Sequence, residues 1–250
     1  MLRRPRIIVL GALILALATA FVSLGLWQLR RLDERKRFNE TLLSRTSEPV
    51  VPFEALPSDL SVVPYRRITA TGIFETDDEI LIVGRSRNTL AGHELVTPLR
   101  LADGSVLLVD RGWVPLDVDD PPVDLAAPPA GELEVTGVLF PSQERGLFGP
   151  RHPPTGVLTR MHRIEISRIA EQLDGEVQPW YLLLESQDPP TQGTYPQSLD
   201  LPSLSEGPHR SYALQWFAFA LIGLVTYAAV LIKESKRVAS ESRIESDNVA

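Results

Sequence analysis

Cysteine is absent from this chain. Without thiols the protein has no disulfide, no thiolate metal ligand, no covalently attached c-type haem and no cysteine nucleophile. Histidine is nearly as scarce, and no two of the four have metal-ligand spacing. Neither a Gly-x-Ser-x-Gly elbow nor a phosphate-binding glycine loop occurs, which disfavours a hydrolase or a nucleotide-binding enzyme. The four histidines are His93, His152, His162 and His209.

A surplus of basic residues is also missing. The chain has 25 lysines and arginines against 32 aspartates and glutamates, and its formal net charge is −7. Residues 27–211 contain 18 basic and 28 acidic residues, a balance of −10. Nucleic-acid binding needs a basic surface that releases counterions from phosphates. We therefore expect no nucleic-acid partner.

Charge is absent altogether from two long stretches. Residues 7–26 are apolar except for Thr19 and Ser23, and residues 212–232 have no charge in 21 positions. At about 1.5 Å of rise per residue, each helix would span roughly 30 Å, the thickness of a bilayer core. We expect transmembrane helices at 7–26 and 209–232. A signal peptide cleaved near Ala18 or Ala20 is the alternative for the first, but the run continues past both sites.

The short termini predict the orientation. Three arginines precede the first apolar run, and Lys233, Lys236 and Arg237 follow the second. The positive-inside rule then places residues 1–6 and 233–250 in the cytoplasm and residues 27–208 outside. Basic residues at 30–37 oppose this assignment, although long domains cross largely regardless of charge. No transit peptide precedes the first run, so a bacterial inner (plasma) membrane is the simplest location.

Between the apolar runs the pattern changes from helix to strand. A helical continuation is expected to reach Arg45, before Pro49 and Pro52. Asp103-Gly104 between two apolar runs is the strongest hairpin signal. We therefore predict an α+β membrane protein, with two transmembrane helices flanking a β-rich, mostly antiparallel domain with one short helix. Strands are expected at 65–74, 79–83, 94–101, 105–114, 132–140 and 180–185, the helix at 165–173, and a Pro- and Ser-rich tether at 187–208.

Several conspicuous residues have ordinary structural explanations. The pairs Arg66-Arg67 and Asp110-Arg111 are expected to be solvated or structurally paired. We expect Gly72 and Gly112 to serve close backbone approach or a bulge. Trp113 and Trp180 are typical core residues.

The start of the second apolar run is the best candidate site. On a helix beginning near Pro208, His209, Tyr212, Ala213 and Trp216 share one face. In a helical hairpin, Trp27 and Gln28 should lie at the same depth. A neutral imidazole among aromatic rings suits an axial haem ligand, so His209 is the candidate metal ligand, with Arg210 holding a propionate. Alternatively, these residues form an ordinary aromatic belt at a membrane interface.

Four stretches together resemble one family over nearly the whole chain. They are LGLWQLRRLDERK, YRRITATGIF, LVTPLRLADGSVLLVDRGWVP and HRSYALQWFAFALI. In this order, and framed by two apolar runs, they resemble the surfeit locus protein 1 family of cytochrome c oxidase assembly factors. The sequence departs from the family pattern at Asp110, where Asn is frequent, and at Arg35, where Lys is usual.

The resemblance implies a non-enzymatic assembly factor for haem–copper oxidases. It would act when haem a enters cytochrome c oxidase subunit I, beside haem A synthase, and carries a haem-ligand role over to His209. A cofactor-free membrane scaffold that stabilises assembly intermediates is the alternative. A third hypothesis, an enzyme or ligand sensor outside the membrane, would require a cleft with convergent polar groups and perturbed acids, and the sequence shows none.

Overall fold

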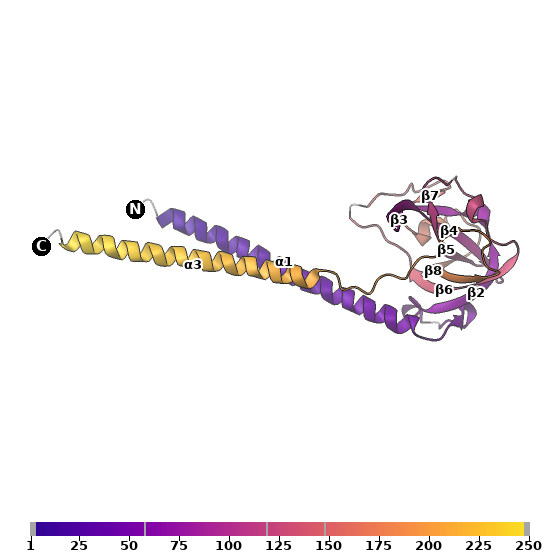
Figure 1. The fold of residues 1–250 in the computed structure, drawn as a ribbon, viewed down its shortest axis with the longest axis horizontal. Coiled ribbons are helices and arrows are strands. Elements are labelled where there is room, and N and C mark those ends of the chain that lie inside the picture. Colours follow the sequence, from indigo (N-terminus) through magenta and orange to yellow (C-terminus); the bar gives the residue numbers. More distant parts are fainter. Residues whose placement is uncertain (1–3, 58, 119, 148, 248–250) are drawn as a thin grey trace. The chain divides into compact units, whose positions relative to one another are not determined.

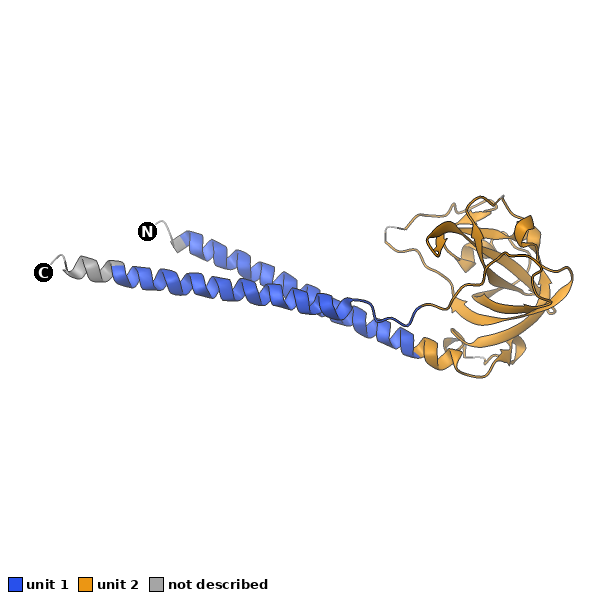
Figure 2. Cartoon of the chain, in the orientation of Figure 1, with its two compact units in different colours: residues 1–40, 203–250 blue, residues 41–202 orange. Residues whose placement is uncertain are grey.

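The computed structural model describes residues 4–57, 59–118, 120–147 and 149–247. The chain divides into two compact units (Figure 2). Residues 1–40 together with 203–250 form a helical unit, and residues 41–202 form a β-rich domain. The division at 40/41 falls inside the first helix, so that helix contributes its last residues to the β-rich domain.

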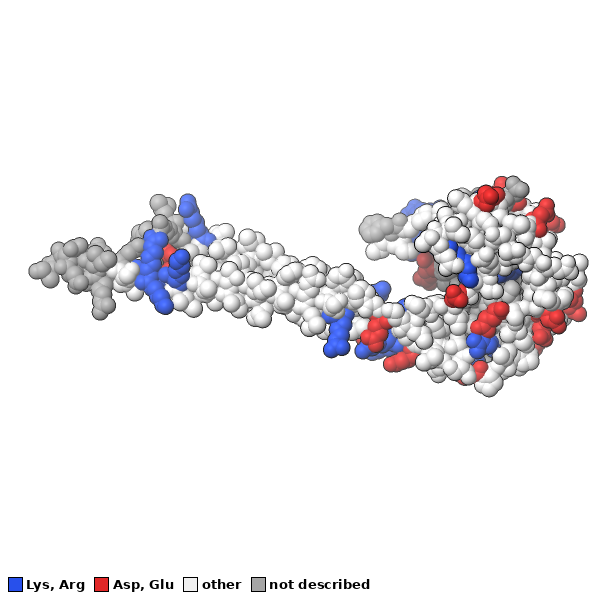
Figure 3. All heavy atoms as spheres, in the orientation of Figure 1, with Lys and Arg blue, Asp and Glu red and all other residues white. Residues whose placement is uncertain are grey.

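Two long helices make up the helical unit. α1 runs from Arg4–Thr46, through the predicted span and its predicted continuation without a break, and α3 covers His209–Asp247 (Figure 1). Both are long and apolar enough to cross a membrane, with mean hydropathies of 2.7 and 1.9 in their most apolar windows. Figure 3 shows their uncharged middle stretch bounded by charged residues.

The β-rich domain contains every strand that the sequence predicts. Regular side-chain alternation accounts for them, as in β2, where Ile68, Ala70 and Phe74 are buried. The short β1 and β7 and four 3-10 turns were not predicted. The strands are β1 Val51–Pro52, β2 Arg67–Phe74, β3 Ile80–Arg87, β4 Leu90–Leu101, β5 Val106–Pro115, β6 Glu132–Pro141, β7 Arg160–Met161 and β8 Val177–Asp188. The helix α2 is Ile166–Ala170, and the 3-10 turns are η1 Phe53–Ala55, η2 Leu60–Val62, η3 Thr76–Asp78 and η4 Asp124–Ala126.

The sheet is mixed, which corrects the expectation of a mostly antiparallel domain. Its order is β1-β2-β6-β8-β5-β4-β3-β7, and the pairs β1–β2, β3–β7 and β5–β8 are parallel. The last of these has a simple cause. β8 is inserted between β5 and β6, which run in opposite directions, so it has to be parallel to one of them.

An additional β2–β4 pairing closes part of the sheet on itself. The strands β2, β6, β8, β5 and β4 thereby form a small closed barrel. Its interior holds aliphatic and aromatic side chains from all five strands, Trp180 among them. Closure removes two sheet edges that would otherwise expose unpaired backbone groups.

The predicted hairpin turn is confirmed at Asp103-Gly104. Gly104 has φ +85°, a conformation that suits glycine, and its N–H donates to the Leu101 carbonyl at 3.0 Å. The Asp103 carboxylate accepts bonds from the N–H and hydroxyl of Ser105, at 2.9 and 2.7 Å. This local chemistry sets the register between β4 and β5.

Both glycines expected at close approaches are confirmed there. A side chain at Gly72 would collide with the Arg100 carbonyl of the neighbouring strand. Gly112 has φ +132°, adjoins the β4–β5 register shift and faces the backbone of Gln197. That contact lets Trp113 and Gln197 exchange backbone hydrogen bonds of 2.8 and 2.9 Å, which fix the segment after β8 to the barrel.

Arg111 is structurally paired, as expected, but inside the domain. Its side chain is fully buried and lies 3.0 Å from the Glu79 carboxylate. Its second terminal nitrogen donates to the Ala126 carbonyl at 2.7 Å, and Glu79 also accepts from the Val123 N–H. Burial raises the pKa of Glu79 and lowers that of Arg111. The pair therefore holds residues 123–126 against the barrel.

Replacing Arg111 with alanine should lower the free energy of unfolding by about 3–5 kcal/mol, because it leaves Glu79 buried without its cation. The loss of unfolding free energy should be smaller at about pH 5 than at about pH 8. A Glu79 whose pKa is raised in the folded state lowers stability only at a pH at which this carboxyl ionises in the unfolded chain. Denaturant unfolding followed by tryptophan fluorescence measures it.

Arg31→Ala removes a mostly exposed ion pair with Glu34 and should change stability by less than about 1 kcal/mol. Equal losses in both variants would contradict the assignment.

Candidate functional site at the helical hairpin

The two long helices contact each other along one continuous stripe. Between residues 5 and 35 of α1, the residues that are not exposed follow one another at alternating intervals of four and three residues. α3 repeats the spacing between His209 and Tyr227, with Phe217 as one addition. Such a seven-residue repeat is typical of helices packed as a left-handed coiled coil. The stripe on α1 comprises Ile7, Gly11, Ile14, Ala18, Phe21, Gly25, Gln28, Leu32 and Arg35, and that on α3 comprises His209, Ala213, Trp216, Ala220, Gly223 and Tyr227.

Contacts along the stripe show that the helices are antiparallel. The Tyr227 hydroxyl donates to the Ile7 carbonyl at 3.2 Å, near one end. Toward the middle, the Trp216 ring stacks on Phe21, with centroids 5.6 Å apart. At the other end Gln28 meets His209. The hairpin thus brings together segments about 180 residues apart in the sequence.

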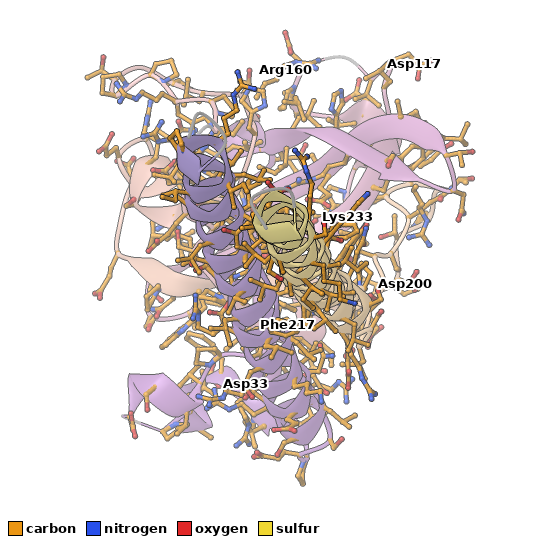
Figure 4. All side chains as sticks on the ribbon, turned by 90° about the vertical axis from the view of Figure 1, so that its left-hand side faces the viewer. Asp33, Asp117, Arg160, Asp200, Phe217 and Lys233 are labelled. Carbon is orange, nitrogen blue, oxygen red and sulfur yellow. The ribbon has the colours of Figure 1, made fainter. Side chains whose placement is uncertain are left out.

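Small residues allow this close pairing. A side chain at Gly25 would lie 2.6 Å from the Phe217 ring, and one at Gly11 would collide with the Tyr227 hydroxyl. Ala213 and Ala220 are 1% and 4% exposed. Figure 4 views the helices along their length, with Phe217 labelled. Small side chains at every seventh position leave room for rings of the other helix, so the helices fit by shape where apolar burial provides little driving force.

His209 and Gln28 form the polar end of the stripe. The imidazole Nδ1 lies 2.9 Å from the Gln28 Oε1. Because a carboxamide oxygen only accepts, Nδ1 carries the hydrogen and Nε2 keeps its lone pair. No residue that the structure describes makes a hydrogen bond to Nε2. This is the arrangement in which a histidine can bind a metal, with the other ring nitrogen held by an outer partner.

The residues just before His209 are also attached to α1. Arg35 donates to the carbonyls of Ser203 and Ser205, at 2.6 and 3.0 Å, and Asn39 donates to the Leu204 carbonyl at 2.6 Å. Lys36 lies 3.9 Å from Glu206. These contacts fix the residues that lead into α3, and with them the start of the helix at His209.

The structure brings together only part of the predicted site. His209, Gln28 and Trp216 lie in the α1–α3 contact as expected. Tyr212 and Trp27 are each 47% exposed, so they lie beside the contact rather than within it. Arg210 is likewise exposed. The face that contacts α1 therefore contains fewer residues than predicted. The ring on which Trp216 stacks is that of Phe21.

Sequence reasoning missed Phe21, Arg35 and Asn39 as parts of this arrangement. A signal was available, because Gly11, Ala18 and Gly25 are small residues seven apart and Ala213 and Ala220 repeat the interval. That repeat indicates helix packing in addition to membrane crossing.

Comparison with known proteins identifies the family. The SURF1 family model matches residues 15–221. A SURF1-like protein of Rickettsia felis is 26% identical over 212 residues, which cover 84% of this chain and 91% of the relative. An uncharacterized SURF1-like protein of Mycobacterium bovis is 28% identical over 94% of this chain and 88% of its own length. Surfeit locus protein 1 of Xenopus tropicalis is 27% identical over 67% of this chain and 59% of its own.

The chain belongs to the SURF1 family. This confirms the resemblance seen in the sequence, and the family is known generally for cytochrome oxidase assembly factors. The matched region begins within α1, contains the whole β-rich domain and ends within α3. The Gln28–His209 pair lies inside it.

Cross-linking tests the register of the hairpin. Because the chain has no cysteine of its own, only the two introduced cysteines can form a disulfide within it. Ala18→Cys combined with Ala220→Cys should form a disulfide under mild oxidation, because both positions are buried in the stripe. The control pair, Leu17→Cys with Leu221→Cys, is 46% and 62% exposed and should not cross-link within a chain. Gel mobility after protease cleavage between the helices measures both. Cross-linking of the control pair alone would refute the register.

Proposed function

We propose that this SURF1-family protein is a non-enzymatic, membrane-anchored assembly factor for haem–copper cytochrome c oxidase. It assists the delivery or insertion of haem a into subunit I. Family membership supports the general role. The single observation that supports the haem role is the His209–Gln28 hydrogen bond, because it leaves Nε2 free at the boundary of an apolar segment.

The residues around His209 suit a haem. His209 would bind the iron through Nε2, and exposed Arg210 would pair with a propionate. Tyr212 and Trp27 present partly exposed rings. Trp216 is held by Phe21 and would support the same face. When bound, the haem would be cargo that the protein passes on, and its iron would supply the coordination bond to His209.

The chain's own residues perform the positioning. Gln28 selects the His209 tautomer and orients the ring. The contacts of Arg35 and Asn39 hold the residues before His209 against α1. No general acid, base or nucleophile is needed, because transfer of a whole haem changes ligands without changing covalent bonds.

Charge supports the proposed orientation. Arg6 lies near the start of α1 and Lys233 follows the charge-free stretch of α3, so one end of the hairpin is basic. By the positive-inside rule that end faces the cytoplasm of a bacterial cell membrane. The β-rich domain is then extracytoplasmic, where it would meet subunit I and haem A synthase.

The cofactor-free scaffold remains the competing hypothesis. One observation favours it: the imidazole already has a partner in Gln28, so the hairpin needs no ligand to satisfy its Nδ1–H. In that case the β-rich domain would perform the function by binding and stabilising assembly intermediates.

Replacing His209 distinguishes the two. Protein purified in detergent from cells that make haem a should carry its absorption bands, and His209→Ala should lose them. Gln28→Leu should weaken haem retention by about 10- to 100-fold, the usual loss for an outer partner of a metal ligand. His162→Ala, an exposed histidine of the β-rich domain, is the control and should retain haem.

The outcomes separate the hypotheses. Equal haem in the wild type and His209→Ala, or haem in neither, refutes the ligand role. Assembled oxidase measured in membranes then decides about the scaffold. If His209→Ala restores oxidase in a deletion strain while lacking haem, the scaffold is correct.

A further inference from the structure

The β-rich domain contains a cavity of ≈ 530 Å³ that the proposed function does not use. It lies over the outer face of the barrel wall. In β8, Trp180 and Leu182 belong to the core, whereas Tyr181 and Leu183 line the cavity, as strand alternation requires. The turn after β3 and residues 199–202 complete the lining, and Asp200 of that segment is labelled in Figure 4.

Four polar side chains of this cavity are paired with one another: Arg85, Glu94, Gln143 and Tyr181. The Arg85 guanidinium lies 2.7 Å from the Glu94 carboxylate and also contacts the Gln143 amide oxygen at 3.5 Å. The Gln143 amide nitrogen donates to the Tyr181 hydroxyl at 3.1 Å. The charge of Arg85 is therefore neutralised by Glu94. Tyr181 also stacks on Phe140, with ring centroids 5.8 Å apart, so one wall is aromatic.

Asp110 is not part of this hydrogen-bond network. Its position corrects the expectation that this residue is solvated or paired. The residue is 3% exposed, and its Oδ1 accepts one long bond, 3.3 Å from the Gly112 N–H. No residue that the structure describes bonds to its other oxygen. The charged and titratable groups around it are Arg85 and Arg87 of β3, Glu94 of β4, Tyr181 of β8 and Asp200.

Strand alternation explains how this acid comes to face the cavity, because Leu107 and Val109 of β5 point into the barrel core and Asp110 therefore points outward; a β-bulge follows directly. Asp110 pairs with Val96 and Gly112 with Leu95, so Arg111 is the extra residue in β5. Arg111 turns inward to Glu79, and Asp110 turns to the cavity. Burial, strengthened by the charge of Glu94, raises the pKa of Asp110 well above its usual value. The carboxyl is thus held without a counter-ion.

We propose that this cavity binds a small organic cation, a protonated amine whose ammonium group pairs with Asp110 while its carbon skeleton lies against Phe140 and Tyr181. An isolated buried carboxyl is stabilised either by a proton or by a cation. The ammonium N–H groups donate to the Asp110 oxygens, and the aromatic wall also attracts cations. The proton displaced from Asp110 passes to solvent, so binding releases protons.

Two other ligand classes fit the cavity less well. A carboxylate or phosphate fits less well, because Arg85 is already engaged by Glu94, and the acids Asp110 and Asp200 of the lining would repel the anion even though Arg87 would attract it. A metal ion usually requires several ligands, and of the three carboxylates in the lining Glu94 is already paired with Arg85. No group of three or more His, Asp or Glu side chains suited to a metal ion occurs among the described residues. The cation site is independent of the haem role.

Titration calorimetry on the full-length protein in detergent tests the proposal with three matched probes. These are 2-phenylethylamine, 2-phenylethanol and 3-phenylpropionate, which carry a positive, a neutral and a negative group on similar skeletons. The amine should bind and the other two should not. Repeating the titration in buffers of different ionisation heat should show a proton release that increases as the pH is lowered, with affinity increasing as the pH rises.

Asp110→Asn should weaken amine binding by about 10- to 100-fold and abolish the proton release, because the amide keeps the shape but not the charge. Glu134→Gln removes an exposed acid from β6 and should change neither. Thermal unfolding checks that both variants fold. Equal binding of the alcohol or the carboxylate, no binding of the amine, or unaltered binding to Asp110→Asn would overturn the proposal. If Asp110→Asn does not fold, wild-type affinity that does not fall as the pH is lowered overturns the proposal alone.

Discussion

The antiparallel contact between α1 and α3 is the constraint on which the candidate site depends. Gln28 and His209 meet only because small residues, such as Gly25 and Ala213, let two helices from opposite ends of the chain approach closely. In an apolar environment this packing has to come from shape and a few polar contacts, since apolar burial adds little there. The polar pair at one end and the Tyr227–Ile7 hydrogen bond at the other therefore set the register.

Local sequence signals predicted the elements well. The helices, the strands and the Asp103-Gly104 turn each follow from short-range chemistry: charge-free length, side-chain alternation and a glycine at positive φ. The likeness of four short motifs also identified the family. His209 with Gln28 was predictable because two spans joined by one domain bring their outer ends to the same depth.

Pairings between distant segments could not be predicted in this way. The position of β8 between β5 and β6 depends on how the barrel closes, and strand sequences do not encode their neighbours. Alternation places Asp110 on the outer face of β5 and Arg111 on the inner face, but the burial of Asp110 depends on β8 and residues 199–202, which lie far away in the sequence. The sequence therefore predicted a solvated or structurally paired role for both residues, and only Arg111 is paired.

His209 and Asp110 represent two ways in which a fold leaves a polar group available. His209 has one ring nitrogen held by Gln28, so its other nitrogen is oriented and available to a metal. Asp110 forms no ion pair with a residue that the structure describes, so its availability depends on what else can supply positive charge. The first arrangement favours a ligand that coordinates, and the second favours one that carries its own charge. The two sites therefore differ in the chemistry they select and belong to different units of the chain.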